Sequence, residues 1–74
     1  MNKIQVRIDT QKDVRDFVGV ATSISNSVFL EDGTGFRVDA KSLMGVMYGT
    51  SEFSNLYVLS DCDTLETKFS KFLV

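Results

Sequence analysis

The sequence contains no histidine, no proline and no tryptophan, and only one cysteine, Cys62, among its 74 residues. Without histidine the chain lacks the commonest general base, the commonest metal ligand and the usual phosphorylated ring nitrogen. A lone cysteine cannot close a disulfide within the chain, which favours a reducing, cytoplasmic location. We therefore expect a cytoplasmic protein that is not an enzyme and that holds no metal and no cofactor.

Long apolar runs are also missing. No stretch approaches the roughly 20 residues of a membrane span, and no signal-peptide block follows the first residues, so we expect no membrane insertion. Eight Lys and Arg against ten Asp and Glu give a net charge of −2, which offers no general attraction to nucleic acid. Apolar residues make up 43% of the chain, enough for one small domain over residues 1–74.

Alternating apolar residues open the chain, and Ile4, Val6 and Ile8 predict a strand with one buried face. A helix should follow, with Asp13 as its N-cap and Asp16 helping to satisfy the free amides of its first turn. Its apolar residues fall on one helical stripe, namely Val14, Phe17, Val18 and Ala21.

Two strand-like segments, 27–31 and 36–40, flank Asp-Gly-Thr-Gly and predict a β-hairpin. Gly33 and Gly35 favour the positive φ angles of a turn. The third glycine and the following helix of a phosphate-binding loop are missing, so we interpret this segment as a turn.

Ser42 precedes a short apolar helix that we expect to end at Gly49. Residues 55–60 predict a fourth strand. Asp63, with Glu66 three positions later, predicts a capped final helix over residues 63–73. This helix should bury one face, made of Leu65, Phe69, Phe72 and Leu73. The order β-α-β-β-α-β-α predicts an α+β sandwich in which helices cover one face of a sheet.

Most candidate reactive groups are weak. The acidic pair at residues 31–32 and the acidic segment 61–63 both lack the ligand spacing of a calcium loop. Cys62 has no histidine base and two flanking aspartates that disfavour the thiolate, so we interpret it as an unreactive loop thiol. No spacing among the ten acidic residues singles out a catalytic pair.

The segment Lys-Ser-Leu-Met-Gly-Val-Met at residues 41–47 is different. A helix of under three turns cannot bury Leu43, Met44 and Met47 together, so at least one of them should face solvent, and methionine suits an adaptable docking surface. A phosphate on Ser42 would meet the free amides of the helix N-terminus beside that patch. The alternative is a plain N-cap followed by three core residues.

This segment closely resembles the regulatory serine segment of HPr, the histidine-containing phosphocarrier of the bacterial sugar phosphotransferase system. The first strand, first helix, hairpin and closing helix follow in the HPr order along the whole chain. The resemblance implies the HPr open-faced sandwich, a four-stranded antiparallel sheet covered on one face by three helices.

The phosphoryl-accepting loop of HPr is not retained. Where HPr carries Gly-(Leu/Ile)-His-Ala-Arg-Pro, this chain has the shorter Asp-Thr-Gln-Lys-Asp at residues 9–13. Thr10, Gln11 and Lys12 would form a degenerate active-site loop, in which Lys12 offers a point charge in place of the arginine fork. Asp13 would repel an approaching phosphate. The resemblance therefore implies that histidine phosphocarrier activity is lost.

The regulatory serine segment of the family is present in this chain. In the family, the serine that matches Ser42 is phosphorylated by HPr kinase/phosphorylase, and the phosphorylated form binds a transcription regulator. The resemblance implies a non-catalytic regulatory or protein-interaction module with Ser42 as a phosphorylation switch. Its implied partner-binding residues are Leu43, Met44 and Met47, with Lys41 and Arg15 at the rim.

The implied partners are proteins: HPr kinase/phosphorylase, enzyme I-like proteins or a transcription regulator. Residues 48–51 depart from the Ser-Leu-Gly that commonly follows in the family, which loosens the assignment of the usual partner. Two alternatives stay open: a phosphocarrier whose phosphorylation site has moved, to Asp13 or Thr10, and a domain that keeps only the fold for binding or self-association. We expect a monomer or a weak homo-oligomer.

Overall fold

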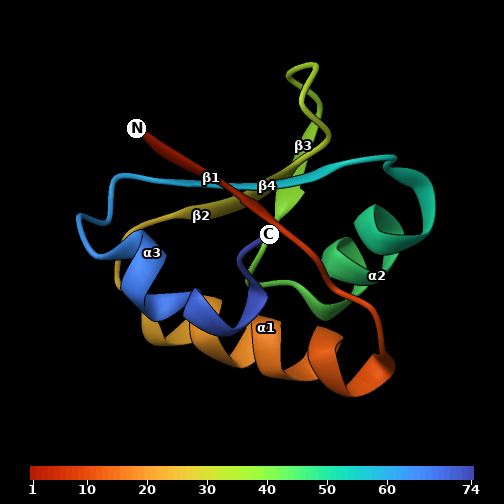
Figure 1. The fold of residues 1–74 in the computed structure, drawn as a ribbon, viewed down its shortest axis with the longest axis horizontal. Coiled ribbons are helices and arrows are strands. Elements are labelled where there is room, and N and C mark those ends of the chain that lie inside the picture. The colour runs from red at the N-terminus through yellow and green to blue at the C-terminus, as the bar shows by residue number, and fades with distance from the viewer.

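The computed structural model describes residues 1–74 and places the helices on one side of a four-stranded sheet (Figure 1). The element order confirms the predicted β-α-β-β-α-β-α, with a short 3₁₀-helix, η1, after the last helix. The elements are β1 (Asn2–Val6), α1 (Gln11–Ser23), β2 (Val28–Glu31), β3 (Arg37–Asp39), α2 (Leu43–Glu52), β4 (Leu56–Ser60), α3 (Leu65–Lys68) and η1 (Ser70–Phe72).

The strands lie in the order β1-β4-β2-β3, and every neighbouring pair is antiparallel. In the middle of the sheet, Val58 of β4 is paired with Ile4 of β1 on one side and with Leu30 of β2 on the other. This is the predicted four-stranded antiparallel sheet with three helices on one face. No helix is both long and apolar enough to cross a membrane.

The hairpin between β2 and β3 turns at Gly33 and Gly35, whose φ angles are +93° and +107°. The predicted turn is therefore confirmed, because these angles favour residues without a side chain. Asp32 accepts hydrogen bonds at one carboxylate oxygen from the backbone N–H and the hydroxyl of Thr34, both at 2.7 Å. These bonds lower the pKa of Asp32 below its usual value, and the bond from the Thr34 backbone N–H has the larger effect.

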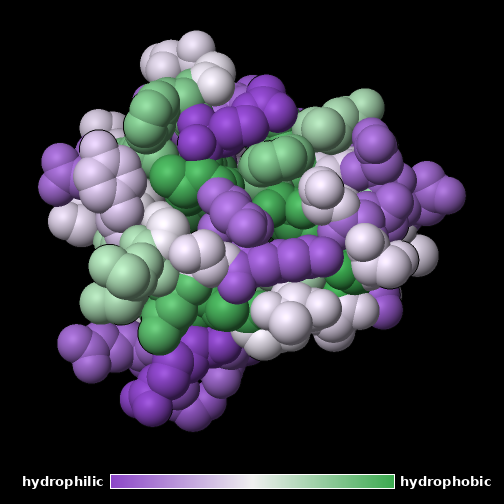
Figure 2. All heavy atoms as spheres, turned by 180° about the vertical axis from the view of Figure 1, so that it is seen from behind, coloured by the Kyte–Doolittle hydropathy of each residue, from purple (hydrophilic) through white to green (hydrophobic).

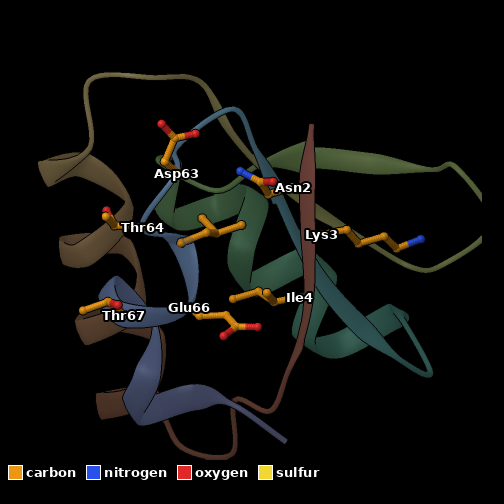
Figure 3. Close-up of a pocket in the computed structure, with 8 residues that line it drawn as sticks. Asn2, Lys3, Ile4, Asp63, Thr64, Glu66 and Thr67 are labelled. Atoms are coloured by element: carbon orange, nitrogen blue, oxygen red, sulfur yellow. The ribbon is translucent and has the colours of Figure 1, made fainter.

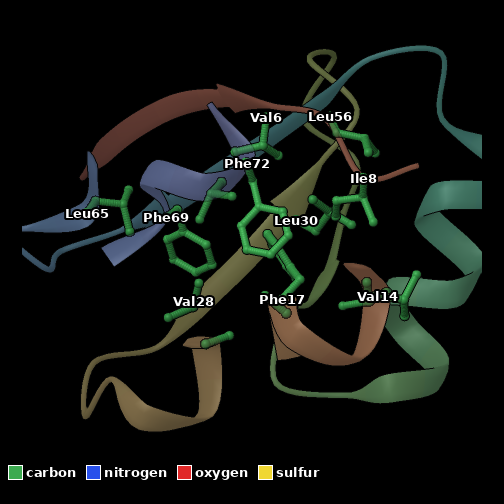
Figure 4. Close-up of a cluster of buried hydrophobic side chains, with 14 of the residues drawn as sticks. Val6, Ile8, Val14, Phe17, Val28, Leu30, Leu56, Leu65, Phe69 and Phe72 are labelled. Carbon is green, nitrogen blue, oxygen red and sulfur yellow. The ribbon is translucent and has the colours of Figure 1, made fainter. Parts of the chain in front are cut away.

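The core lies between the sheet and the helices (Figure 4). At its centre the fully buried ring of Phe17, from α1, packs 4.9 Å from Phe69 and 5.4 Å from Phe72, measured between ring centroids. Val28 and Leu30 of β2 meet these rings from the sheet side. Aromatic packing of this kind is the main apolar contribution in so small a domain.

Helix α1 begins earlier than the sequence analysis predicted, because Thr10 and not Asp13 is its N-cap. The Thr10 hydroxyl accepts a hydrogen bond from the Asp13 backbone N–H (3.0 Å), and the Asp13 carboxylate accepts one from the Thr10 N–H (3.2 Å). These reciprocal bonds form a capping box. Asp16, expected in the first turn, therefore lies one turn further along. Val14 and Ala21 are buried, as the apolar stripe predicted.

The closing helix is much shorter than predicted. Helix α3 begins without a side-chain cap, so the expected capping box of Asp63 and Glu66 is wrong. The chain then forms the 3₁₀-helix η1, and its last residues pair with the end of β1 and with Arg7. The Arg7 N–H donates to the Phe72 carbonyl (2.8 Å), and Leu73 forms a β-bridge to β1. Leu73, predicted on the buried face, is consequently 42% exposed.

Helix α2 continues past Gly49, which was predicted to end it, as far as Glu52. The N–H of the C-cap residue, Phe53, donates to the Gly49 carbonyl at 2.9 Å, so the backbone at Gly49 is helical and hydrogen-bonded. Gly49 is buried, facing Leu30 in the sheet and Phe53. This glycine serves close packing and not helix termination.

Candidate protein-docking site at helix α2

Helix α2 turns its large apolar side chains toward solvent and its smaller ones toward the sheet. Val46 and Gly49 are buried, whereas Leu43, Met44 and Met47 are 46%, 81% and 51% exposed. The prediction that at least one of the three faces solvent is confirmed, and the alternative of three core residues is wrong. We call Leu43, Met44 and Met47 the apolar patch. Contiguous exposed apolar surface of this kind is typical of interaction sites.

The apolar patch borders the N-terminal half of α1. Leu43 and Met47 line a shallow hollow of about 350 Å³ together with Gln11, Val14 and Arg15. Arg15 thus lies at the rim position that the sequence analysis gave it. Figure 2 shows the molecule from behind, so that the side of α2 is at the left; green apolar side chains gather on the left half of this view, among white and purple ones.

Ser42 is the N-cap of α2, as predicted, and its hydroxyl oxygen accepts a hydrogen bond from the Gly45 N–H at 3.1 Å. A Cβ atom at Gly45 would lie 3.0 Å from the Asp39 carbonyl oxygen and 3.3 Å from the Ser42 Cβ, so the absence of a side chain lets this turn close. No acidic residue lies in the first turn of α2. The positive end of the helix dipole is therefore not compensated by a carboxylate of that turn.

Two cations flank the apolar patch. Lys41 directly precedes the N-cap, and its backbone N–H donates to the Asp39 carboxylate at 2.9 Å, whereas its ammonium forms no ion pair. Arg15 is exposed and also forms no ion pair within the chain. Both charges are available to an acidic group on another molecule.

Three aromatic rings extend this surface toward the hairpin. The ring centroids of Phe36, Tyr48 and Phe53 lie 5.8 to 6.4 Å apart, and Phe36 and Tyr48 are each about half exposed. We call these three residues the aromatic cluster. The sequence does not predict this cluster, because no periodic spacing links Phe36, which precedes β3, to Tyr48 of α2 and to Phe53, the C-cap of α2.

The predicted degenerate active-site loop is not a loop in the structure. Thr10 caps α1, and Gln11 and Lys12 form its first turn. The Asp13 carboxylate accepts hydrogen bonds from the backbone N–H groups of Asp9 and Thr10, both at 3.2 Å, and these bonds lower its pKa. An ionised carboxylate therefore occupies the positive end of α1, where an anion would otherwise bind.

Two ammonium groups bind Asp16. Lys12 lies 2.8 Å from its carboxylate, and Lys71 of η1 binds the same oxygen. The bond from Lys12 and then the bond from Lys71 lower the pKa of Asp16 to about 2, and Asp16 in turn raises the pKa of Lys12. Lys12, the one cation of the segment that was predicted to be a degenerate active-site loop, is therefore already paired.

The face of the sheet that carries no helix pairs its own charges. The carboxylate of Glu31 is buried, with one oxygen 3.2 Å from the Lys3 ammonium and the other 3.4 Å from the Arg37 guanidinium. Lys3 also lies over the Tyr57 ring, and Arg37 over the Phe29 ring, at 4.8 and 5.3 Å from the centroids. These contacts leave little unpaired charge on this face for another molecule.

A second hollow, of about 340 Å³, lies between β1 and the start of α3 (Figure 3). Its lining is mostly polar and includes Asn2, Lys3, Asp63, Thr64 and Glu66. Figure 3 shows the carboxylates of Asp63 and Glu66 apart from each other. No group of three or more His, Cys, Asp or Glu side chains in the structure is placed to hold a metal ion.

No protein-family model matches the chain, and no curated protein matches it either. A solved structure, HPr-C-His from Thermoanaerobacter tengcongensis, is similar to it with a TM-score of 0.69 and 24% sequence identity. The match covers 95% of this chain and 84% of that chain. Together with the four-stranded antiparallel sheet and its three helices, this similarity establishes an HPr-like α+β fold.

Proposed function

We propose that this chain is a non-catalytic regulatory module, related to the bacterial sugar phosphotransferase system, that docks a protein through the apolar patch. One observation carries the proposal: α2 exposes Leu43, Met44 and Met47 directly after an N-cap serine, while it buries smaller residues against the sheet. Flexible methionine side chains adapt to a partner surface, and truncating them on a free surface costs the fold little.

Ser42 is the proposed phosphorylation switch of this surface. A phosphate there would lie at the positive end of α2, whose first turn contains no acidic residue, close to free backbone N–H groups and to the neighbouring Lys41. It would add about −1.5 to −2 charges beside an apolar patch, which changes the partner that the patch accepts. The HPr kinase/phosphorylase is the enzyme that we propose to phosphorylate Ser42. A transcription regulator is the protein that we propose to bind the phosphorylated form.

The structure offers less support for a phosphocarrier with a relocated site. Thr10 and Asp13 hold each other in the capping box, and the carboxylate of Asp13 already fills the anion position at the start of α1. Lys12, the cation nearest to them in sequence on that helix, is paired with Asp16. We therefore do not propose phosphoryl transfer from enzyme I to this chain.

The test is the intact mass of the pure protein after incubation in two mixtures. One mixture holds phosphoenolpyruvate with enzyme I, and the other holds ATP with HPr kinase/phosphorylase. We expect one phosphate to be added in the kinase mixture and none in the other.

A Ser42→Asn variant is the matched control, because asparagine caps a helix as well as serine does but accepts no phosphate. A phosphate acquired from phosphoenolpyruvate would contradict the inference that phosphocarrier activity is lost. If neither mixture adds a phosphate, the Ser42 switch is wrong, and only the docking role of the apolar patch remains.

A further inference from the structure

We propose that the outward face of α2 is a self-association surface, on which a second copy of this chain packs its own α2 antiparallel to the first. This inference rests on the docking surface of the proposed function but not on phosphorylation of Ser42. A second copy is the occupant because the two ends of α2 carry opposite charges and its middle turn is apolar, so two antiparallel copies match each other.

The exposed residues of α2 recur at the spacing of one helical turn. They form three successive pairs, Leu43 with Met44, Met47 with Tyr48, and Ser51 with Glu52. Residues four apart lie on the same face of a helix, so these pairs form one continuous stripe. Its first two turns are apolar and its last turn is polar. We call this stripe the outward face of α2.

The amount of apolar surface is suited to a weak dimer. Four large side chains of the outward face are 46% to 81% exposed, and Phe36 adds a half-exposed ring in contact with Tyr48. Side chains of this size present on the order of 500 Å², the upper end of what a typical monomer leaves exposed. An interface of standard size buries ~800 Å² on each partner, so a contact made by this face alone is smaller than standard.

The charges around the outward face determine the orientation. Lys41 and Arg15 lie at the N-terminal end of α2, and Glu52 is its last residue; none of the three forms an ion pair within the chain. In an antiparallel pair, the Lys41 end of each helix meets the Glu52 end of the other. Because the pair is two-fold symmetric, this contact occurs twice. A parallel pair would place like charges together.

Helix geometry supports the same orientation. A helix of ten residues is about 15 Å long, so when the ends of two antiparallel copies meet, their apolar middle turns at Met47 and Tyr48 lie opposite each other. Met47 and Tyr48 of one copy would then pack against the same two residues of the other, and Met44 would lie beside Ser51. Antiparallel packing also brings the positive end of each helix dipole to the negative end of its neighbour.

Two other surfaces that often mediate dimers are already occupied. The C-terminal end of the outer edge of β1 is covered by residues 72–74, whose backbone bonds to residues 5–7. On the open sheet face, Glu31 is paired with Lys3 and Arg37. The outward face of α2 therefore combines exposed apolar area with unpaired charges of both signs, which the other two surfaces do not.

Sedimentation equilibrium of the full chain from about 5 µM to about 1 mM tests the proposal, because a weak dimer dissociates on dilution by mass action. We expect a reversible monomer–dimer equilibrium that Met47→Glu abolishes, since it places two carboxylates at the centre of the contact. Circular dichroism should show that this variant stays folded, because Met47 is half exposed.

A charge-reversal cycle tests the orientation. Lys41→Glu and Glu52→Lys should each raise the dimer dissociation constant about tenfold, and the double variant should restore it, because the two reversed charges again meet as opposites. Lys68→Glu makes the same charge change at an exposed site on α3 and should leave the dimer unchanged.

A monomer at every concentration, a dimer that survives Met47→Glu, or a double variant as weak as the single ones would each overturn the proposal. A monomeric chain would leave the outward face free for a different protein, so the proposed function would stand. Loss of the Ser42 switch in the phosphorylation test would leave this dimer unaffected. The two failures are therefore distinguishable.

Discussion

Gly49 of α2 lies directly against Leu30 at the centre of the sheet, so closely that a Cβ atom built on the glycine would come within 2.8 Å of the Leu30 Cδ2. Leu30 is fully buried and cannot swing away freely. The missing side chain lets α2 approach the sheet. The inner side of α2 carries no side chain at Gly49. The bulky residues of the helix are on its outer side, where they form the apolar patch.

Gly49→Ala should therefore destabilise the protein although alanine is the better helix former. Overpacking against Leu30 and Phe53 should cost about 1–3 kcal/mol, whereas the gain in helix propensity is about 1 kcal/mol. Urea unfolding should show a net loss of free energy of unfolding on the order of 1 kcal/mol.

Gly19→Ala is the matched control for that experiment. Gly19 is an exposed residue within α1, and nothing lies within 4 Å of a Cβ atom built on it. The same substitution should there stabilise the protein by about 0.5–1 kcal/mol, by helix propensity alone. Equal effects at the two glycines would contradict the close contact between α2 and the sheet.

Met44→Ala should leave stability nearly unchanged, because the side chain is 81% exposed. Phe17→Ala should instead cost about 3–5 kcal/mol, since its ring is fully buried between Phe69 and Phe72. Thermal unfolding of the two variants measures the contrast. A loss at Met44 as large as that at Phe17 would mean that Met44 belongs to the core and is not free to dock a partner.

Ser42→Ala should lower the free energy of unfolding by about 1 kcal/mol, because it removes the acceptor of the Gly45 N–H. Ser42→Asn and Ser42→Asp should keep most of that stability, since both side chains cap helices. Chemical denaturation of the three variants checks this order. If alanine proved as stable as asparagine, the cap would contribute nothing, and the alanine variant would serve equally well as a phosphorylation control.

Asp16 should make stability depend on pH in the acid range. Its pKa is lowered from 3.8 to about 2 in the folded protein by the bonds from Lys12 and Lys71, so the ionised carboxylate favours the folded state. That contribution is complete above the unfolded pKa near 4 and is lost as the pH falls toward 2. The advantage of the natural chain over Asp16→Asn should therefore shrink across this window in thermal unfolding. A constant difference between pH 6 and pH 2 would show that the ion pairs do not contribute.

The local patterns of the sequence predicted most of the secondary structure correctly. Alternation in the first strand, the helical stripe that includes Phe17, and the glycines of the hairpin each act over a few neighbouring residues, and each is confirmed. The strand itself ends at Val6, so Ile8, which was predicted to belong to it, is buried beyond its end. The Ser42 cap was predictable for the same reason. Caps, turns and amphipathic faces depend on residues at most four positions apart, so they can be inferred from the order of residues alone.

The ends of the helices were less predictable because distant segments control them. Residues 72–74 pair with β1 and the residues after it instead of continuing α3, and Leu73 is exposed as a result. The start of α1 was missed for a different, local reason: Thr10 and Asp13 are both favourable N-cap residues, and the order of residues alone did not distinguish a capping box begun by Thr10 from an Asp13 cap. Local propensity sets which caps are available, and competition with long-range hydrogen bonds decides where a helix ends.

The composition of the chain already shows that it has no imidazole to phosphorylate, and the order of residues places a serine at the start of an apolar helix. Which side of that helix faces outward depends on packing: Gly49 meets Leu30, so the large residues of α2 remain in solvent. The joining of Phe36, Tyr48 and Phe53 likewise requires β3 to lie beside α2. A surface is made by segments that are far apart in the chain, and only their packing brings its residues together.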